Sequence, residues 1–100
     1  MIIWLKAEEQ HQHKNGGGWV ANTATVEDSV HIGANAWVYG NARVSGNARV
    51  SGNAQVYGDS QVYGNAQVYG DAWVYGDAWV YGDAQVLCVR YYGTRRGERC

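Results

Sequence analysis

The chain has 100 residues, enough for one domain, and it combines 14 Gly, 5 Trp and 8 Tyr with no Pro and no Phe. Abundant Gly, Val, Ala and aromatic residues favour short strands joined by tight turns and argue against a helical core. The formal net charge is only -1. Because general nucleic-acid binders and membrane-surface binders carry a clear basic excess, we expect neither kind of partner.

The N-terminal segment, residues 1–17, differs from the rest of the chain in composition. It opens on the short apolar run MIIWL, turns charged and His-containing, and ends with glycines. The run is too short for a signal peptide or a membrane span, so we expect a cytoplasmic protein. We interpret residues 1–17 as an N-terminal cap with a Gly-rich entry, because the open end of a stack of strands needs a cover.

Residues 18–87 repeat with a period of six, most clearly as NAWVYG, NARVSG, NARVSG, NAQVYG, DSQVYG, NAQVYG, DAWVYG and DAWVYG. Val or Ile recurs at every sixth position from Val20 to Val86, and a residue that is small almost throughout stands two positions earlier. A fixed short period of this kind is typical of a solenoid, in which each unit buries its apolar residues by stacking on the next unit.

Each unit has inward, outward and corner positions, since side chains alternate along a strand. The Ala and Val positions point inward, whereas the residue between them and the Tyr or Ser after Val point outward. Gly followed by Asn or Asp makes the corner, because these residues adopt positive φ most readily. Twelve Val or Ile residues are a thin core for so many ordered residues, which predicts a homo-oligomer.

The repeat resembles the hexapeptide-repeat left-handed parallel β-helix family, in which three units form one triangular coil. More narrowly, GGGWV followed by NAWVYGNARVSGNARVSGNAQVYG is similar to the YdcK-like branch of bacterial and phage proteins, often described as acyltransferases. The resemblance implies an all-β, left-handed helix of about four triangular coils with short caps. It also implies a parallel homotrimer, in the host cytoplasm if the protein is phage-encoded.

With eighteen residues per coil, the outward positions fall on three faces of different chemistry. An exposed apolar face usually marks an interface, so the aromatic face one is expected either to self-associate or to serve as a platform for a ligand or partner. The outward residues are Trp19, Ala21, Trp37, Tyr39, Gln55, Tyr57, Trp73 and Tyr75 on face one; Thr25, Glu27, Arg43, Ser45, Gln61, Tyr63, Trp79 and Tyr81 on face two; and His31, Gly33, Arg49, Ser51, Gln67, Tyr69, Gln85 and Leu87 on face three.

The candidate binding residues combine aromatic rings with two arginines of one coil. Guanidinium groups beside aromatic planes suit a nucleotide or another phosphorylated ligand, whereas two solvated arginines are the plainer explanation. The partner is a small molecule or a protein that the sequence does not name. The candidates are Trp37, Trp73, Tyr39, Tyr57, Tyr75, Arg43 and Arg49.

The alternative function is a CoA-dependent O- or N-acyltransferase with its active site between subunits. The resemblance then implies acetyl-CoA as cofactor and a histidine as general base, and His31 is the only histidine within the repeat. Enzymes of this family generally have more coils, a protruding loop and a C-terminal helix, none of which is visible in the sequence. We therefore favour a non-catalytic binding protein that needs no cofactor.

No metal site is expected. The related zinc-dependent carbonic anhydrases place several histidines on neighbouring coils, whereas this repeat holds only His31. Asp59 and Asp77 are expected to stack above Asn41 at one corner, where solvated turns explain them better than a bound cation.

The C-terminal segment, residues 88–100, departs from the repeat and is predicted to form a closing strand followed by a basic tail. Arg90 falls where a small inward residue is due. Cys88 and Cys100 have no metal-type spacing, so we expect free thiols.

Overall fold

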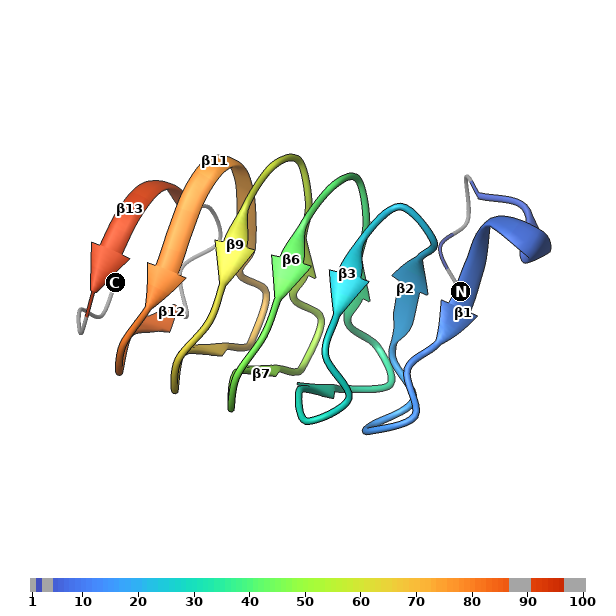
Figure 1. Cartoon of the computed structure of the whole chain (residues 1–100), viewed down its shortest axis with the longest axis horizontal. Coiled ribbons are helices and arrows are strands. Elements are labelled where there is room, and N and C mark those ends of the chain that lie inside the picture. The colour runs from blue at the N-terminus through green and yellow to red at the C-terminus, as the bar shows by residue number, and fades with distance from the viewer. Residues whose placement is uncertain (1, 3–4, 87–90, 97–100) are drawn as a thin grey trace.

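The computed structural model describes residues 2, 5–86 and 91–96, which form a β-solenoid of about four turns with one short 3-10 helix (Figure 1). The coils lie side by side along the longest axis of a molecule that measures 36 × 23 × 19 Å. The elements are η1 (Ala7–Glu9), β1 (Gln10–Gln12), β2 (Trp19–Ala21), β3 (Thr25–Val26), β4 (His31–Ile32), β5 (Trp37–Val38), β6 (Arg43–Val44), β7 (Arg49–Val50), β8 (Gln55–Val56), β9 (Gln61–Val62), β10 (Gln67–Val68), β11 (Trp73–Tyr81), β12 (Gln85–Val86) and β13 (Tyr91–Arg96).

Strands eighteen residues apart in the sequence are paired in parallel, which confirms the three-strand coil. On face one, β2 pairs with β5, β5 with β8 and β8 with β11. The same spacing holds on the other two faces. The paired outward residues are Trp19, Trp37, Gln55 and Trp73 on face one; Thr25, Arg43, Gln61 and Trp79 on face two; and His31, Arg49, Gln67 and Gln85 on face three.

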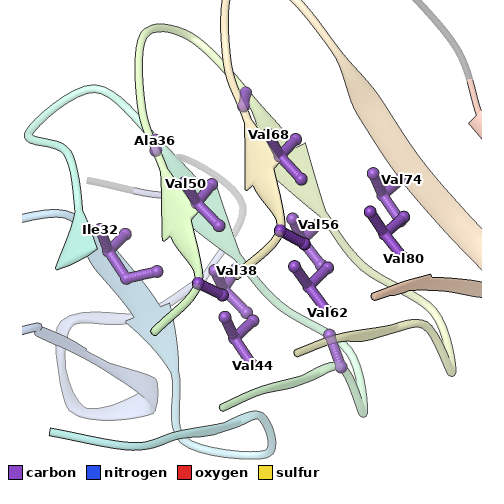
Figure 2. Packing of buried hydrophobic residues seen from close by; sticks show 14 of the residues in the cluster. Ile32, Ala36, Val38, Val44, Val50, Val56, Val62, Val68, Val74 and Val80 are labelled. Atoms are coloured by element: carbon purple, nitrogen blue, oxygen red, sulfur yellow. The ribbon is translucent and has the colours of Figure 1, made fainter. Parts of the chain in front are cut away.

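The interior contains the two inward columns of the repeat. Aliphatic side chains from the three faces converge there and stack from coil to coil (Figure 2). Ser60 replaces Ala in the small column, is fully buried, and donates its hydroxyl hydrogen to the carbonyl oxygen of Tyr57 at 2.8 Å. Val26 is the exception among the valines of residues 5–86, since it is only half-buried. It lies in β3, the terminal strand of its sheet, so its outer side has no paired strand.

From the second coil onward, the corners depend on glycine. From Gly40 to Gly82 the corner glycines have φ between 64° and 71°, and no other residue type among those described has a positive φ. The expectation that Asn or Asp shares this conformation is therefore wrong for the described residues. A Cβ atom on Gly58 would lie 2.9 Å from the backbone nitrogen of Gly76, so the stacked corners leave no room for a side chain.

The corners of the first coil are built differently, because Asn22, Asp28 and Ala34 stand where later coils have Gly. In later coils a backbone N–H bonds to the corner carbonyl of the next coil, as from Asn41 to Gly58 at 2.9 Å. In the first coil, hydroxyl groups bond to these carbonyls instead. Thr23 donates to Gly40, and Ser29 donates to Gly46.

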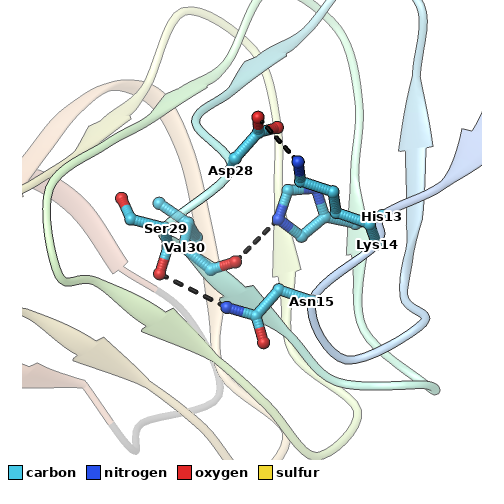
Figure 3. Close-up of polar contacts among 6 residues, drawn as sticks. All are labelled: His13, Lys14, Asn15, Asp28, Ser29 and Val30. Atoms are coloured by element: carbon cyan, nitrogen blue, oxygen red, sulfur yellow. Dashed lines mark hydrogen bonds and ion pairs between the residues drawn. The ribbon is translucent and has the colours of Figure 1, made fainter.

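The N-terminal segment lies across the first coil. β1 runs antiparallel to β2, with Gln10 opposite Ala21. Residues 13–15 contact the first coil on its other side: His13 is buried, and its Nε2 atom lies 2.6 Å from the carbonyl oxygen of Val30 (Figure 3). An ion pair between Lys14 and Asp28, with Nζ and Oδ2 2.9 Å apart, lies beside this contact.

At the C-terminal end, β13 pairs in parallel with β11. β11 runs through the corner at Gly76 and so joins faces one and two into a single sheet. The backbone of residues 94–96 belongs to β13 and pairs with residues 79–81. The predictions for Leu87, Cys88, Arg90 and Cys100 fall outside the described residues.

Candidate interaction surface

Face one presents a ladder of stacked tyrosines. The ring centroids of Tyr39 and Tyr57 are 4.7 Å apart with an interplanar angle of 3°, and those of Tyr57 and Tyr75 are 5.5 Å apart at 13°. Strands of neighbouring coils lie about 4.8 Å apart, which brings identical side chains on successive coils into ring-stacking distance. The coil spacing therefore fixes the ring arrangement.

A polar contact holds the first ring of the ladder. The hydroxyl group of Tyr39 donates a hydrogen bond to Oε1 of Gln55 at 2.7 Å. Burial, with a smaller contribution from the neighbouring Tyr57, raises the pKa of Tyr39 to about 12. The phenol consequently stays protonated to a higher pH than an ordinary tyrosine does. Gln55, which interrupts the tryptophan column, thus binds a ring of the adjacent tyrosine column.

All five aromatic candidates on face one are half-buried within the single chain, so this surface is less exposed than the sequence suggested. The rings cover one another along the ladder, which lowers the exposed fraction of each. The eight outward positions of face one include no charged residue. The face is therefore a flat, uncharged surface whose groups are already ordered. The candidates are Trp37, Tyr39, Tyr57, Trp73 and Tyr75.

Face two contains an exposed ring that the sequence interpretation did not single out. Trp79 is 45% exposed and is the only exposed large hydrophobic residue among those whose side chains the structure describes, residues 2 and 5–86. Its paired neighbour in β9 is Gln61, which supplies no ring to stack on it. The signal was present in the sequence, because Trp79 is the only aromatic residue of its column.

The two arginine candidates do not share a surface with Trp37. Arg43 lies on face two, aligned with Gln61, and Arg49 lies on face three, aligned with Gln67. Both arginines are exposed. Trp37 lies on face one. The structure therefore places these three residues on three different faces, while Arg43 shares a column with Trp79.

The histidines do not form a common site among the described residues. His31 is half-buried in β4 and aligned with Arg49; a Cβ atom on Gly16 would lie 2.9 Å from its Cε1 atom, so the ring abuts that glycine. His13 is buried against the first coil. Exposed His11 has its Nδ1 atom 2.7 Å from Oδ1 of Asn22. His31 is thus the histidine of face three, as its position in the repeat indicates.

The described residues include no cluster of three or more His, Cys, Asp or Glu side chains that could hold a metal ion, and no pocket is found among them. Within residues 2, 5–86 and 91–96, no helix has the length and apolar character needed to cross a membrane. Asn41 and Asp59 do share a corner column, since Nδ2 of Asn41 lies 3.5 Å from Oδ1 of Asp59.

Comparison with known proteins identifies the repeat. A family model for the YdcK beta solenoid repeat matches five overlapping stretches, residues 36–52, 42–58, 48–64, 60–76 and 66–82. No curated protein and no solved structure matches the chain. The matched stretches start at inward Ala positions or at Ser60, which takes the place of Ala in the unit DSQVYG, and each spans almost one coil. With the paired coils described above, they show that residues 36–82 form β-solenoid repeats of the YdcK type.

Proposed function

We propose that the protein is a non-catalytic interaction protein that associates with copies of itself through face one. The observation that supports this proposal is the composition of face one, which combines a ladder of stacked tyrosines with tryptophans and has no charged residue at any outward position. Interface cores are enriched in aromatic residues and depleted of charge in the same way. Association would also add apolar burial to a thin Val and Ala core.

The order of face one favours association energetically. Side chains that are immobilised only on binding cost about 0.5–1.5 kcal/mol each in lost freedom. Tyr39, Tyr57 and Tyr75 are already stacked in the single chain, which lowers that cost. The molecule is 36 Å long and 19–23 Å across, so one face is comparable in size to the roughly 800 Å² per partner of a standard interface.

Light scattering coupled to size-exclusion chromatography at micromolar concentration tests this proposal. The wild type is expected to be an oligomer, and Trp37→Arg, which places a charge in the middle of face one, is expected to be monomeric. Gln67→Arg is the matched control, because Gln67 occupies the equivalent position of face three and is exposed. A wild type that is monomeric, or a Gln67→Arg variant that dissociates as readily as Trp37→Arg, would overturn the proposal.

The partner-binding part of the proposal rests on face two. Arg43, Gln61 and Trp79 follow one another in a single column on successive coils. Adjacent coils are about 4.8 Å apart, so a planar base stacked on Trp79 would leave a phosphate within reach of Arg43. A nucleotide is therefore the ligand class that this column suits.

Calorimetric titration with a nucleoside diphosphate should show binding that Trp79→Ala and Arg43→Gln weaken and that Arg49→Gln leaves unchanged. If the wild type and the three variants bind the nucleotide equally well, this column is not the nucleotide site.

The acyltransferase alternative depends on His31 acting as general base, with acetyl-CoA bound between subunits. His31 is partly exposed on face three, which leaves the alternative open to experiment. Under our proposal the wild type releases no CoA from acetyl-CoA with amine or hydroxyl acceptors. Release of CoA by the wild type, lost in His31→Ala while the oligomer persists, would favour the enzyme instead.

A further inference from the structure

We infer that face one packs against face one of a second copy with the two solenoid axes antiparallel, forming a twofold dimer. This inference rests on the proposed self-association through face one and specifies its geometry. It follows from the charges that border face one. We call the corner residues that follow face one the downstream column and those that precede it the upstream column.

The two columns carry their carboxylates at one end of the molecule. The hydrogen bond from Asn41 to Asp59 at 3.5 Å fixes the alignment of the downstream column, and the bond from Asn53 to Asp71 at 3.3 Å fixes that of the upstream column. All these corner residues are exposed. In coil order, the downstream column is Thr23, Asn41, Asp59 and Asp77, and the upstream column, from the second coil, is Asn35, Asn53 and Asp71.

Two identical flat faces can meet about a twofold axis in two ways. An axis parallel to the solenoid keeps coils of equal number together and places the downstream column of one copy against the upstream column of the other. Asp77 then faces Asp71 of the second copy, and this contact occurs twice. Like charges placed opposite each other at an interface are unfavourable.

An axis parallel to the strands instead reverses the order of the coils and places each column against itself. Asp77 in the fourth coil then faces Thr23 in the first, and Asp59 in the third faces Asn41 in the second. The Asn41 amide can donate an N–H to a carboxylate, and Thr23, whose hydroxyl already donates to Gly40, places no charge opposite Asp77. In the upstream column Asn53 faces Asn35, so no two carboxylates are opposed.

A ring of three copies distributes these charges less favourably. Interfaces in such a ring are heterologous, so face one would meet a different surface of the neighbouring copy. Faces two and three each present an exposed arginine, Arg43 and Arg49. Burying an unpaired charge is costly, whereas pairing face one with itself buries none. The antiparallel dimer therefore fits the charge pattern better than the trimer that the family resemblance implies.

Disulfide cross-linking tests the geometry in a background in which Cys88 and Cys100 are replaced by Ser. Under mild oxidation, Thr23→Cys/Asp77→Cys should form a covalent dimer, and Asp71→Cys/Asp77→Cys should not. Positions 23 and 77 are three coils, about 14 Å, apart within one chain, too far for an internal disulfide. The single variants Thr23→Cys and Asp77→Cys are controls and should remain unlinked.

Light scattering, read together with the cross-linking, distinguishes failure of self-association from failure of the antiparallel arrangement. If the protein with Cys88 and Cys100 replaced by Ser is monomeric, the proposed self-association itself is wrong. A trimer, a dimer that cross-links only through Asp71→Cys/Asp77→Cys, or a dimer that cross-links through neither pair would leave self-association standing and overturn the antiparallel arrangement. A dimer that cross-links through Thr23→Cys/Asp77→Cys supports it.

Discussion

The side-chain carboxamide of Gln10 and the backbone of Ile2 exchange two hydrogen bonds, as two paired strand residues do. The Ile2 N–H donates to Oε1 at 2.8 Å, and Nε2 donates to the Ile2 carbonyl oxygen at 3.1 Å. Both residues are buried. The Gln10 side chain thus satisfies backbone groups at the first end of the solenoid, where the ladder of parallel strands stops.

Gln10→Leu should destabilise the protein, because it keeps the size of the side chain and leaves the N–H of Ile2 unpaired and buried. The Ile2 carbonyl oxygen keeps the hydrogen bond that the Leu5 N–H donates at 3.2 Å. An unsatisfied buried polar group costs about 1–3 kcal/mol, and urea unfolding should show a loss of that order. Gln12→Leu is the control, since Gln12 is exposed and donates one bond to the Gly17 carbonyl at 3.2 Å. Equal stability of the two variants would contradict this role for Gln10.

The stability of the tyrosine ladder should depend on alkaline pH. The pKa of Tyr39 is about 12 in the folded chain, against the ordinary tyrosine value of 10.0. Because the folded pKa is the higher one, the stabilisation from Tyr39 is fully present below pH 10 and is lost as the pH rises towards 12. Tyr39→Phe keeps the ring but cannot ionise. The difference in unfolding free energy between wild type and Tyr39→Phe should therefore shrink across this window, and a constant difference would disprove the assignment.

Gly58→Ala should destabilise the solenoid through two effects that a control can separate. The left-handed backbone conformation costs a non-glycine residue roughly 1–2 kcal/mol, and the new Cβ atom would also lie 2.9 Å from the Gly76 nitrogen. Gly17→Ala carries only the backbone cost, because φ there is 79° and nothing lies within 4 Å of the added Cβ atom. Thermal unfolding should show the larger loss for Gly58→Ala. The reverse order would mean that the corners can spread apart.

The six-residue period predicted most of the fold because each position of the unit has one structural role: inward, outward or corner. Every inward Val from Val38 to Val86 is buried, and the eighteen-residue pairing follows from three units per coil. The structure of the two ends could not be predicted from the period, because it depends on individual contacts. Neither the Gln10–Ile2 exchange nor the half-buried state of Val26 follows from a repeat rule.

The candidate surface was predicted in position but less well in exposure. Assigning Trp37 and Tyr39 to one face needs only the period, and the strand register confirms it. The exposed fraction depends on what each ring stacks against. Tyr57 lies between two tyrosine rings, whereas Trp79 is aligned with Gln61 and remains 45% exposed. Reading down each column, in addition to along each unit, recovers this difference.

Val56→Ala should be the more damaging of two matched truncations in the inward column. Val56 is completely buried in a middle coil, with coils on both sides that hold their spacing, so the removed methyl groups would leave a cavity. The expected loss is on the order of 2 kcal/mol in urea unfolding. Val26 occupies the equivalent inward position of another unit, on face two, but it is half-buried in the terminal strand β3, where water can fill the space. Val26→Ala should therefore cost less than half as much; equal losses would show that the end coil packs as tightly as the middle ones.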